Sequence, residues 1–329
     1  MFYNDMKTIT AITDALKTSL STVEVLPGTI DQWQTDLAIP FLLVDGHLGL
    51  PQKLLYKLLP CALSLLKQFR LSSSRSPPSS HETTSLLEAS SIILLANPAH
   101  QTALNQRKRL ILAAHWSVKQ ELDFSTLLLS SSREASKQSI LWDHRRWLFQ
   151  TEYIHNRDHP RLIPAPLLEK ELGVILRGCE SYPRNYYAWA HWEYCLDKLY
   201  EGCAKDEGDY FPIVTRASNQ LLRWMEHHLS DYSAAHHLCR LVHRFHGRTK
   251  TYEEMSDVDL SFDQLSKQAI SLLSRYADHE ALWMYLRASW AVGGDQFHRE
   301  DLRASIDALP TCKYREQCIS WCNLVKQFE

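Results

Sequence analysis

Histidine is concentrated in one stretch of the chain, HHLSDYSAAHHLCRLVHRFH (227–246), which contains six His and one Cys. A zinc site needs four nitrogen or sulfur ligands that converge tetrahedrally. If the stretch is helical, His243 and His246 share a face with His236 or Cys239. However, His236 and His237 belong to columns of a repeated pattern described below, and His144 and His191 share one of those columns. Packing is therefore the favoured interpretation, and we expect no metal site.

The other residue types that could do chemistry give no stronger pattern. Cys312, Cys318 and Cys322 lack the CxxC pairing of a structural zinc site, so we expect thiols buried in helices. The chain contains no nucleophile elbow, Walker loop, HExxH pair or dinucleotide-binding glycine pattern. We therefore expect this chain to bind no cofactor of its own and to lack a complete catalytic centre.

Aromatic residues gather in YPRNYYAWAHWEY (182–194), which holds four Tyr and two Trp. Such a run suits a core segment, a platform on which bases or sugars stack, or one copy of a repeat. Comparison along the chain favours the repeat.

Five segments are related to one another. They are NPAHQTALNQRKRLI (97–111), SKQSILWDHRRWLF (136–149), YPRNYYAWAHWEYCL (182–196), SDYSAAHHLCRLVH (230–243) and ADHEALWMYLRASW (277–290). One column, here called the anchor, holds Leu104, Trp142, Trp189, Ala235 and Trp283, at spacings of 38, 47, 46 and 48 residues. Two residues after each anchor lie Gln106, His144, His191, His237 and Tyr285. Self-similarity at such a period indicates a repeat architecture.

Each anchor follows an amphipathic run. In LLEKELGVILRGCESY and FDQLSKQAISLLSRY, apolar residues recur at offsets 0, 4, 7, 8 and 11 from Leu168 and from Leu265. This spacing is typical of a helix with one buried face. Asn, Pro or Asp then interrupt the pattern, and a second helix begins near the anchor. A lone hairpin cannot cover its apolar face, so neighbours must stack on it. We predict an all-α protein, a right-handed α-solenoid or crescent of about five helical hairpins.

The remaining segments frame the repeats. We expect an N-terminal helical segment with a short extended stretch or hairpin at PFLLVDGHLGLP (40–51), and a kink or break at Pro60. A second Ser-rich patch (130–139) is expected to be a loop. The predicted parts are an N-terminal segment (1–70), a Ser/Pro-rich linker or long loop (71–85), the repeats (86–290) and a C-terminal helical cap (291–329).

Composition limits the classes of partner. A formal net charge of −2 argues against a nucleic-acid binder, whose affinity depends on neutralising phosphates. That balance also disfavours an RNA-binding helical repeat. No window approaches the ~18 consecutive apolar residues of a membrane span. The first residues lack the layout of a secretory signal, and the final KQFE is not a lipidation box. We expect a soluble, cytoplasmic protein with reduced cysteines.

The period alone also fits HEAT or armadillo repeats, but the motif distinguishes them. The pattern NPxNYxxWxHRxxxL resembles the repeat of protein prenyltransferase α subunits. The matching residues are Asn97, Pro98, Arg107 and Lys108; Trp142, His144, Arg145 and Arg146; and Pro183, Asn185, Tyr186, Trp189 and His191. The Arg three places past the anchor is replaced by Trp192, Leu238 and Leu286, and two anchors are Leu104 and Ala235. Within the family, the likeness is to the α-like subunits of a third type of geranylgeranyltransferase.

The resemblance implies a function. Such α subunits wrap around a β subunit that holds the zinc ion and the prenyl diphosphate. This chain would then support transfer of geranylgeranyl from its diphosphate to a C-terminal Cys of a protein substrate, such as a farnesylated SNARE. Its partner would be a β subunit of the Rab geranylgeranyltransferase type. The alternative is a non-catalytic helical-repeat scaffold.

The resemblance also implies roles for individual residues. Lys137 takes the place of a Lys near the diphosphate, although a solvated Lys in a Ser-rich loop is an equal alternative. Asn185, Tyr186 and Tyr187 take the places of residues on the rim that faces substrate and partner. The repeat residues are expected to pack between hairpins: Leu104, Arg107, Trp142, His144, Arg145, Trp189, His191 and Trp283. Arg145 is expected to bond helix-end carbonyls or a carboxylate.

Overall fold

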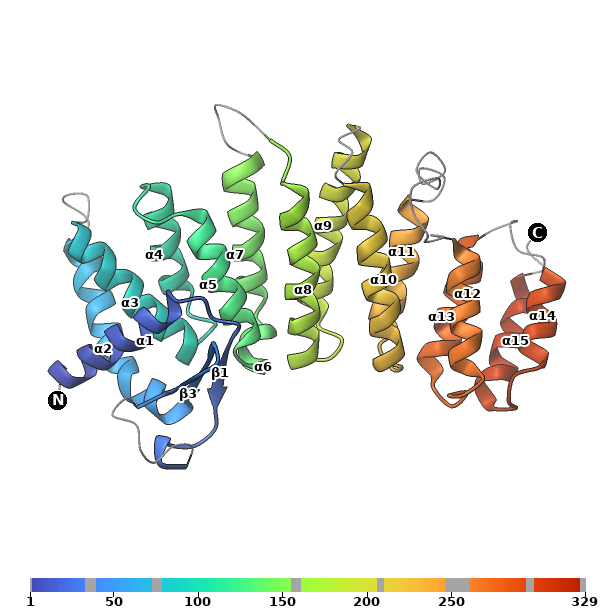
Figure 1. The fold of residues 1–329 in the computed structure, drawn as a ribbon, viewed down its shortest axis with the longest axis horizontal. Helices are drawn as coiled ribbons and strands as arrows, with labels where there is room; N and C mark the ends of the chain where they lie inside the picture. The colour runs from blue at the N-terminus through green and yellow to red at the C-terminus, as the bar shows by residue number, and fades with distance from the viewer. Residues whose placement is uncertain are drawn as a thin grey trace. The chain divides into compact units, whose positions relative to one another are not determined.

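The computed structural model describes residues 2–32, 40–72, 79–154, 161–205, 210–245, 261–293 and 299–325 (Figure 1). These residues form fifteen α-helices and one small sheet, which confirms the predicted all-α repeat class. The chain divides into two compact units, one of Met1–Arg161 with Gly173–His191 and one of Leu162–Leu172 with Trp192–Glu329. Within the described residues, no helix is long and apolar enough to cross a bilayer. The handedness and crescent shape remain predictions.

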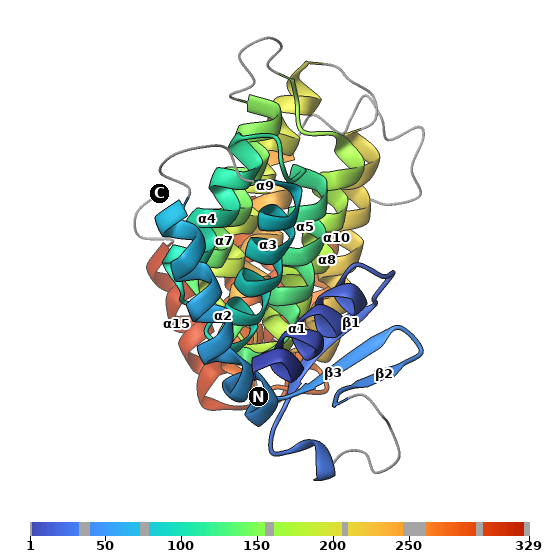
Figure 2. The ribbon, with the colours of Figure 1, turned by 90° about the vertical axis from the view of Figure 1, so that its left-hand side faces the viewer.

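The N-terminal region combines two helices with a three-stranded sheet (Figure 2). Its elements are α1 (Phe2–Leu16), β1 (Thr22–Leu26), a 3-10 turn (Ile30–Gln32), β2 (Leu42–Val44), β3 (His47–Pro51) and α2 (Gln52–Ser72). The strand order is β1-β3-β2, with β1 parallel and β2 antiparallel to β3. Asp45 and Gly46 have φ of 49° and 79°, which suits a two-residue hairpin turn. The extended stretch expected at 40–51 is thus a β-hairpin, whereas β1 was not expected.

From residue 80 the helices follow one another as hairpins. They are α3 (Ser80–Ala96) and α4 (Gln101–Leu112); α5 (Val118–Ser130), the short α6 (Arg133–Ser136) and α7 (Ser139–Phe149); and α8 (Ala165–Ser181) and α9 (Tyr186–Ala204). They continue with α10 (Phe211–His227) and α11 (Tyr232–Phe245), α12 (Phe262–Leu273) and α13 (Glu280–Gly293), and α14 (Arg299–Asp307) and α15 (Lys313–Val325). A π-helical turn (Gln150–Ile154) extends α7.

The same contacts recur at the start of the second helix. The anchor indoles of Trp142 and Trp283 donate to the backbone carbonyls six residues earlier, Ser136 O at 2.8 Å and Ala277 O at 2.7 Å. Four residues before the anchor, a side chain caps the helix. Asn185 Oδ1 accepts from Ala188 N at 3.2 Å, and Asp231 Oδ1 accepts from Ala234 N at 3.1 Å. Such caps satisfy N–H groups that the helix itself leaves unpaired.

Hydrogen bonds one repeat period apart hold successive hairpins together within a unit. In α10, Arg216 Nη2 donates to Glu169 Oε2 of α8 at 3.0 Å. Gln268 of α12 donates to Leu222 O of α10 at 2.9 Å. First helices therefore pack on first helices, as stacking of repeats requires.

Three sequence expectations are corrected. Helix α2 runs through Pro60 without ending. Helix α3 begins inside the expected linker (71–85), because Ser79 and Glu82 form a capping box at Ser80; residues 73–78 lie outside the described residues. The Ser-rich patch (130–139) contains the short helix α6 rather than only a loop.

The C-terminal cap expected at 291–329 contains a further hairpin, α14 and α15. Cys312, just before α15, donates to Ala277 O at 3.4 Å. Asn185, just before α9, makes the equivalent bond to Ser136 O at 2.7 Å. The repeat geometry therefore continues past the last recognisable motif.

Candidate functional site

Ser136, at the end of α6, joins three segments of the chain. Its carbonyl accepts from Trp142 Nε1 at 2.8 Å and from Asn185 Nδ2 at 2.7 Å. Its hydroxyl donates to Gly178 O at 2.7 Å and lies 2.9 Å from Asn185 Nδ2. Ser136 is fully buried. These bonds fix the α6–α7 junction against the α8–α9 turn.

Lys137 follows Ser136 directly and closes α6. Its backbone N–H donates to Arg133 O at 3.2 Å, so Arg133 and Lys137 lie one helical turn apart. The Lys137 ammonium pairs with the Glu134 carboxylate at 2.7 Å, and the lysine side chain is 38% exposed. Lys137 is thus a partly exposed cation that directly follows Ser136, a buried and hydrogen-bonded residue.

Tyr186 and Tyr187 follow Asn185 and begin α9. They are 75% and 38% exposed, and their rings meet edge to face at 5.5 Å. Nearby, the Arg133 guanidinium lies 5.2 Å from the centre of the Tyr182 ring. The Asn185–Ser136 hydrogen bonds hold the backbone just before the two tyrosines against the backbone just before Lys137. Lys137, Tyr186 and Tyr187, here called the edge, form the candidate site.

The structure places Asn185 differently from the resemblance. The resemblance places it on the rim, but its side chain is fully buried. Its amide nitrogen donates to Ser136 O, and its amide oxygen accepts from Tyr187 N at 3.1 Å and from Ala188 N. Both ends of the amide are therefore engaged inside the chain, and Asn185 fixes the turn that precedes Tyr186 and Tyr187.

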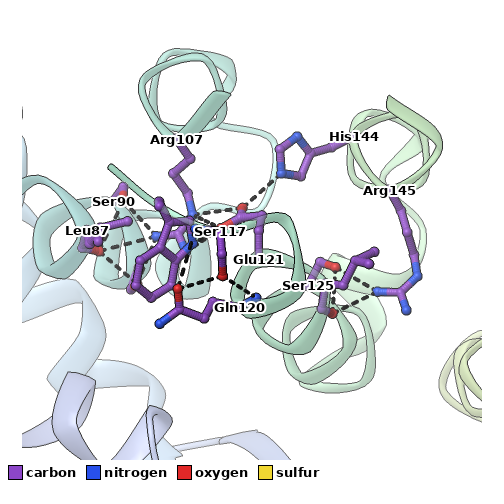
Figure 3. Close-up of polar contacts among 12 residues, drawn as sticks. Leu87, Ser90, Arg107, Ser117, Gln120, Glu121, Ser125, His144 and Arg145 are labelled. Atoms are coloured by element: carbon purple, nitrogen blue, oxygen red, sulfur yellow. Dashed lines mark hydrogen bonds and ion pairs between the residues drawn. The ribbon is translucent and has the colours of Figure 1, made fainter. Parts of the chain in front are cut away.

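A second polar group is buried between α4, α5 and α7 (Figure 3). Glu121 accepts from Arg107 Nε at 2.9 Å and pairs with Arg107 Nη2 at 2.7 Å. On its other side, Glu121 Oε1 lies 2.8 Å from His144 Nε2. The Trp116 indole donates to the same carboxylate at 2.9 Å. All three ionisable side chains are at most 2% exposed.

The environment of Glu121 keeps it charged. Burial alone would raise its pKa, but the Arg107 charge and the hydrogen bond from His144 outweigh burial and hold the pKa well below 4.5. The three ionisable side chains are shielded from solvent, which suits a structural role. One carboxylate joins α4, α5 and α7.

The other repeat residues are buried as well. Arg145 donates from Nη1 to Leu122 O at 3.0 Å and to Ser125 Oγ at 2.7 Å. The remaining anchors and histidines are at most 4% exposed: Leu104, Trp142, Trp189, His191 and Trp283. Where the Arg column departs from the motif, the replacements are also buried: Trp192, Leu238 and Leu286. At these positions an apolar side chain takes the buried place that Arg107 and Arg145 occupy in the earlier repeats.

Sequence reasoning missed the partners of these residues. Glu121, Ser136 and Gly178 carry no chemical signature, yet each holds a repeat residue in place. One signal was available: a Glu–Leu pair occurs in two first helices, at Glu121 and at Glu171, and both carboxylates are buried. A charged residue on an otherwise apolar helix face indicates a buried partner.

The described part of the histidine-rich stretch, residues 227–245, lies mostly in α10 and α11. Across the described parts of the chain, no group of three His, Cys, Asp or Glu side chains is placed to hold a metal ion. Cys239 is buried, which raises its pKa to about 12. His237 Nδ1 lies 2.7 Å from Glu193 Oε1. His246, one of the candidate ligands, lies outside the described residues.

Comparison with known proteins confirms the resemblance. A family model described as "Protein prenyltransferase alpha subunit repeat" matches residues 168–199, which include the α8–α9 turn. Over 319 residues the chain is 25% identical to "Protein prenyltransferase alpha subunit repeat-containing protein 1" of Danio rerio, covering 85% of this chain and 70% of the relative.

Two further relatives also match this chain. The Homo sapiens protein of the same name is 28% identical over 210 residues, covering 60% of this chain and 48% of its own. The "Geranylgeranyl transferase type-2 subunit alpha" of Saccharomyces cerevisiae is 22% identical over 220 residues, covering 64% of this chain and 58% of its own. The chain thus spans about half the length of the human and yeast relatives.

Proposed function

We propose that this chain is the α-type subunit of a heterodimeric protein geranylgeranyltransferase. The observation that carries the proposal is the exposed edge of Lys137, Tyr186 and Tyr187, fixed by the Ser136–Asn185 hydrogen bonds. The family model matches residues 168–199, which include Tyr186 and Tyr187 of this edge. The yeast relative's name supports the choice of geranylgeranyl transfer.

In this proposal, the chain supplies charge and shape, and its partner supplies the reaction centre. The transferred group would leave a diphosphate on which negative charge develops. A fixed ammonium at Lys137 would stabilise that charge. The Tyr186 and Tyr187 phenols could donate hydrogen bonds to the same group. Zinc, which lowers the pKa of a substrate thiol, would belong to the β subunit. The substrate would be a protein with a C-terminal Cys, such as a farnesylated SNARE.

The location we propose is the cytoplasm. All eight cysteines are free thiols. This state fits a reducing compartment, because disulfides persist in oxidising ones.

Complex formation tests the proposal first. The chain is co-expressed with a panel of prenyltransferase β subunits, including the Rab geranylgeranyltransferase type, and each is tested for co-purification. We expect one stable heterodimer. If the folded chain retains no β subunit from the panel, the proposal fails.

Two observations favour the alternative of a non-catalytic scaffold. The Lys137 ammonium already pairs with Glu134, and Asn185 is turned inward. Exposed pairs of this kind contribute only about 0.2–1 kcal/mol, so an anionic ligand could displace Glu134 at small cost. The two functions therefore differ in whether Lys137 affects turnover, which is measurable.

A further inference from the structure

Helix α2 has two different faces. One packs on α3 and α1, and buries a row of apolar residues: Leu55, Leu58, Ala62, Leu65 and Leu66. The other face carries exposed side chains; Figure 2 shows α2 beside α1. Terminal helices of repeat arrays usually have a polar outer face. Here Tyr56 and Leu63 are instead 52% and 38% exposed on it.

The charges on this outer face have one sign. Lys53, Lys57 and Lys67 are all exposed, and α2 contains no Asp or Glu along its length. One acidic group pairs with them: the carboxylate of Asp5 in α1 lies 3.8 Å from Lys57 Nζ. Three cations against one carboxylate leave the face positive, although the whole chain carries a formal charge of −2. The face is therefore a local concentration of positive charge.

We propose that the outer face of α2 docks on the surface of an anionic lipid bilayer. Lysines attract an anionic leaflet, and their long stems lie along apolar material while the ammonium stays in water. Tyrosine suits the headgroup level, where one end of the side chain is wet and the other apolar. Leu63 adds apolar area two turns from Tyr56 on the same side of the helix.

An acidic protein surface would also attract lysines, but it explains less. Tyr56 and Leu63 are exposed and lie between Lys53 and Lys67 along the helix. A bilayer interface accepts an aromatic ring and methyl groups without a shaped pocket. The inference does not rest on the proposed function, although a lipid diphosphate substrate would make membrane proximity useful.

Vesicle sedimentation tests the inference with the full chain. The vesicles are phosphatidylcholine alone, or phosphatidylcholine with phosphatidylserine. We expect binding only to the phosphatidylserine vesicles, weakening as salt is raised. Changing Lys53, Lys57 and Lys67 to Gln should lower the partition coefficient about fivefold per lysine, the equivalent of about 1 kcal/mol each. A Tyr56→Ser, Leu63→Ser variant should also bind less.

Three exposed lysines elsewhere, Lys119, Lys170 and Lys205, provide the matched control. Their change to Gln removes the same charge and should leave vesicle binding within twofold. Circular dichroism verifies that every variant is folded. Equal losses in both triple variants, equal binding to the neutral vesicles, or no binding to phosphatidylserine would each overturn the inference. Binding to polyglutamate without binding to vesicles would indicate an acidic protein partner and would overturn it too.

Discussion

Lys137 is the residue at which the catalytic and scaffold functions make opposite predictions. In a heterodimer with its β subunit, Lys137→Ala should lower kcat for geranylgeranyl transfer by at least about tenfold. A fully enclosed donor is worth ~10²–10³-fold, and Lys137 is partly exposed, so its effect should be smaller. Steady-state kinetics with labelled geranylgeranyl diphosphate measure the change.

Two further variants test whether a loss of turnover is specific to the Lys137 ammonium. Glu134→Gln releases the Lys137 ammonium from its ion pair, and should leave turnover unchanged or increase it. Lys119→Ala removes an exposed lysine at the far end of α5 and should have no effect. Unchanged turnover in Lys137→Ala would remove the leaving-group role and leave the scaffold function in place.

Glu121 tests the buried ion group. Glu121→Gln keeps the shape of the side chain but leaves the Arg107 charge buried without its counter-ion. We expect the free energy of unfolding to fall by about 3–5 kcal/mol in urea denaturation at neutral pH. Glu134→Gln, an exposed change of the same kind, should stay within about 0.5 kcal/mol of the wild type. A Glu121→Gln protein as stable as the wild type would show that the group contributes nothing.

The same group predicts a pH dependence. The folded pKa of Glu121 lies below its usual 4.5, since Arg107 and His144 favour the charged form despite burial. The unfolded state therefore binds the proton more tightly. The stabilisation is complete above the unfolded pKa and is lost as pH falls towards the folded value. The stability difference between wild type and Glu121→Gln should shrink as pH decreases below about 5. A constant difference would contradict this assignment.

At the scale of the element, two glycines of α8 form a matched pair. A Cβ at Gly178 would lie 3.0 Å from the Trp142 ring and 3.2 Å from Ser136 Oγ, whereas a Cβ at Gly173 would meet nothing within 4 Å. Gly178→Ala should destabilise the protein by about 1–3 kcal/mol through overpacking at the Ser136 junction. Gly173→Ala should stabilise it by roughly 0.5–1 kcal/mol, because alanine favours a helix. Thermal or urea unfolding gives both values, and equal effects would refute the tight contact.

The end of α4 gives a second element-scale prediction. Ala114 has φ of 58°, and His115 N donates to Leu110 O at 2.9 Å, which together form the helix-ending turn that glycine favours. Ala114→Gly should stabilise the protein by about 0.5–1 kcal/mol, because glycine adopts this φ without strain. Ala113, with φ of −87°, is the control, and Ala113→Gly should give no gain. A loss on Ala114→Gly would contradict the assigned backbone geometry.

The elements differ in how far the sequence predicts them. The hairpins follow from the apolar period, and the predicted stripe of α8 is buried from Leu168 to Cys179. Tyr276 was placed on the α12 stripe but is 41% exposed, because α12 ends at Leu273. Strand β1 was not predicted, since its pairing with β3 depends on residues 25 positions away. Local patterns give helices, whereas tertiary contacts decide strands and helix ends.

The candidate site shows the same division. The resemblance indicates Lys137, Tyr186 and Tyr187, and their roles stay predictions; the structure shows that the residues just before them, Ser136 and Asn185, are hydrogen-bonded. It could not indicate that Asn185 turns inward, because that depends on Ser136, a residue 49 positions earlier. Polar side chains in a turn have the same sequence pattern whether they face solvent or a buried carbonyl.

At the scale of the whole molecule, the hairpins continue beyond the motif. The Cys312–Ala277 bond repeats the Asn185–Ser136 bond, although α15 carries no anchor Trp at the matching place. Backbone geometry therefore persists where sequence similarity ends.

Geranylgeranyl transfer by the reconstituted heterodimer tests the central claim most directly. The measurement compares label incorporation into a C-terminal cysteine peptide by the purified complex, by this chain alone and by the β subunit alone. We predict transfer by the complex and none by this chain alone. A stable complex that transfers no geranylgeranyl to any peptide of a C-terminal cysteine panel, or a β subunit equally active without this chain, would contradict the account.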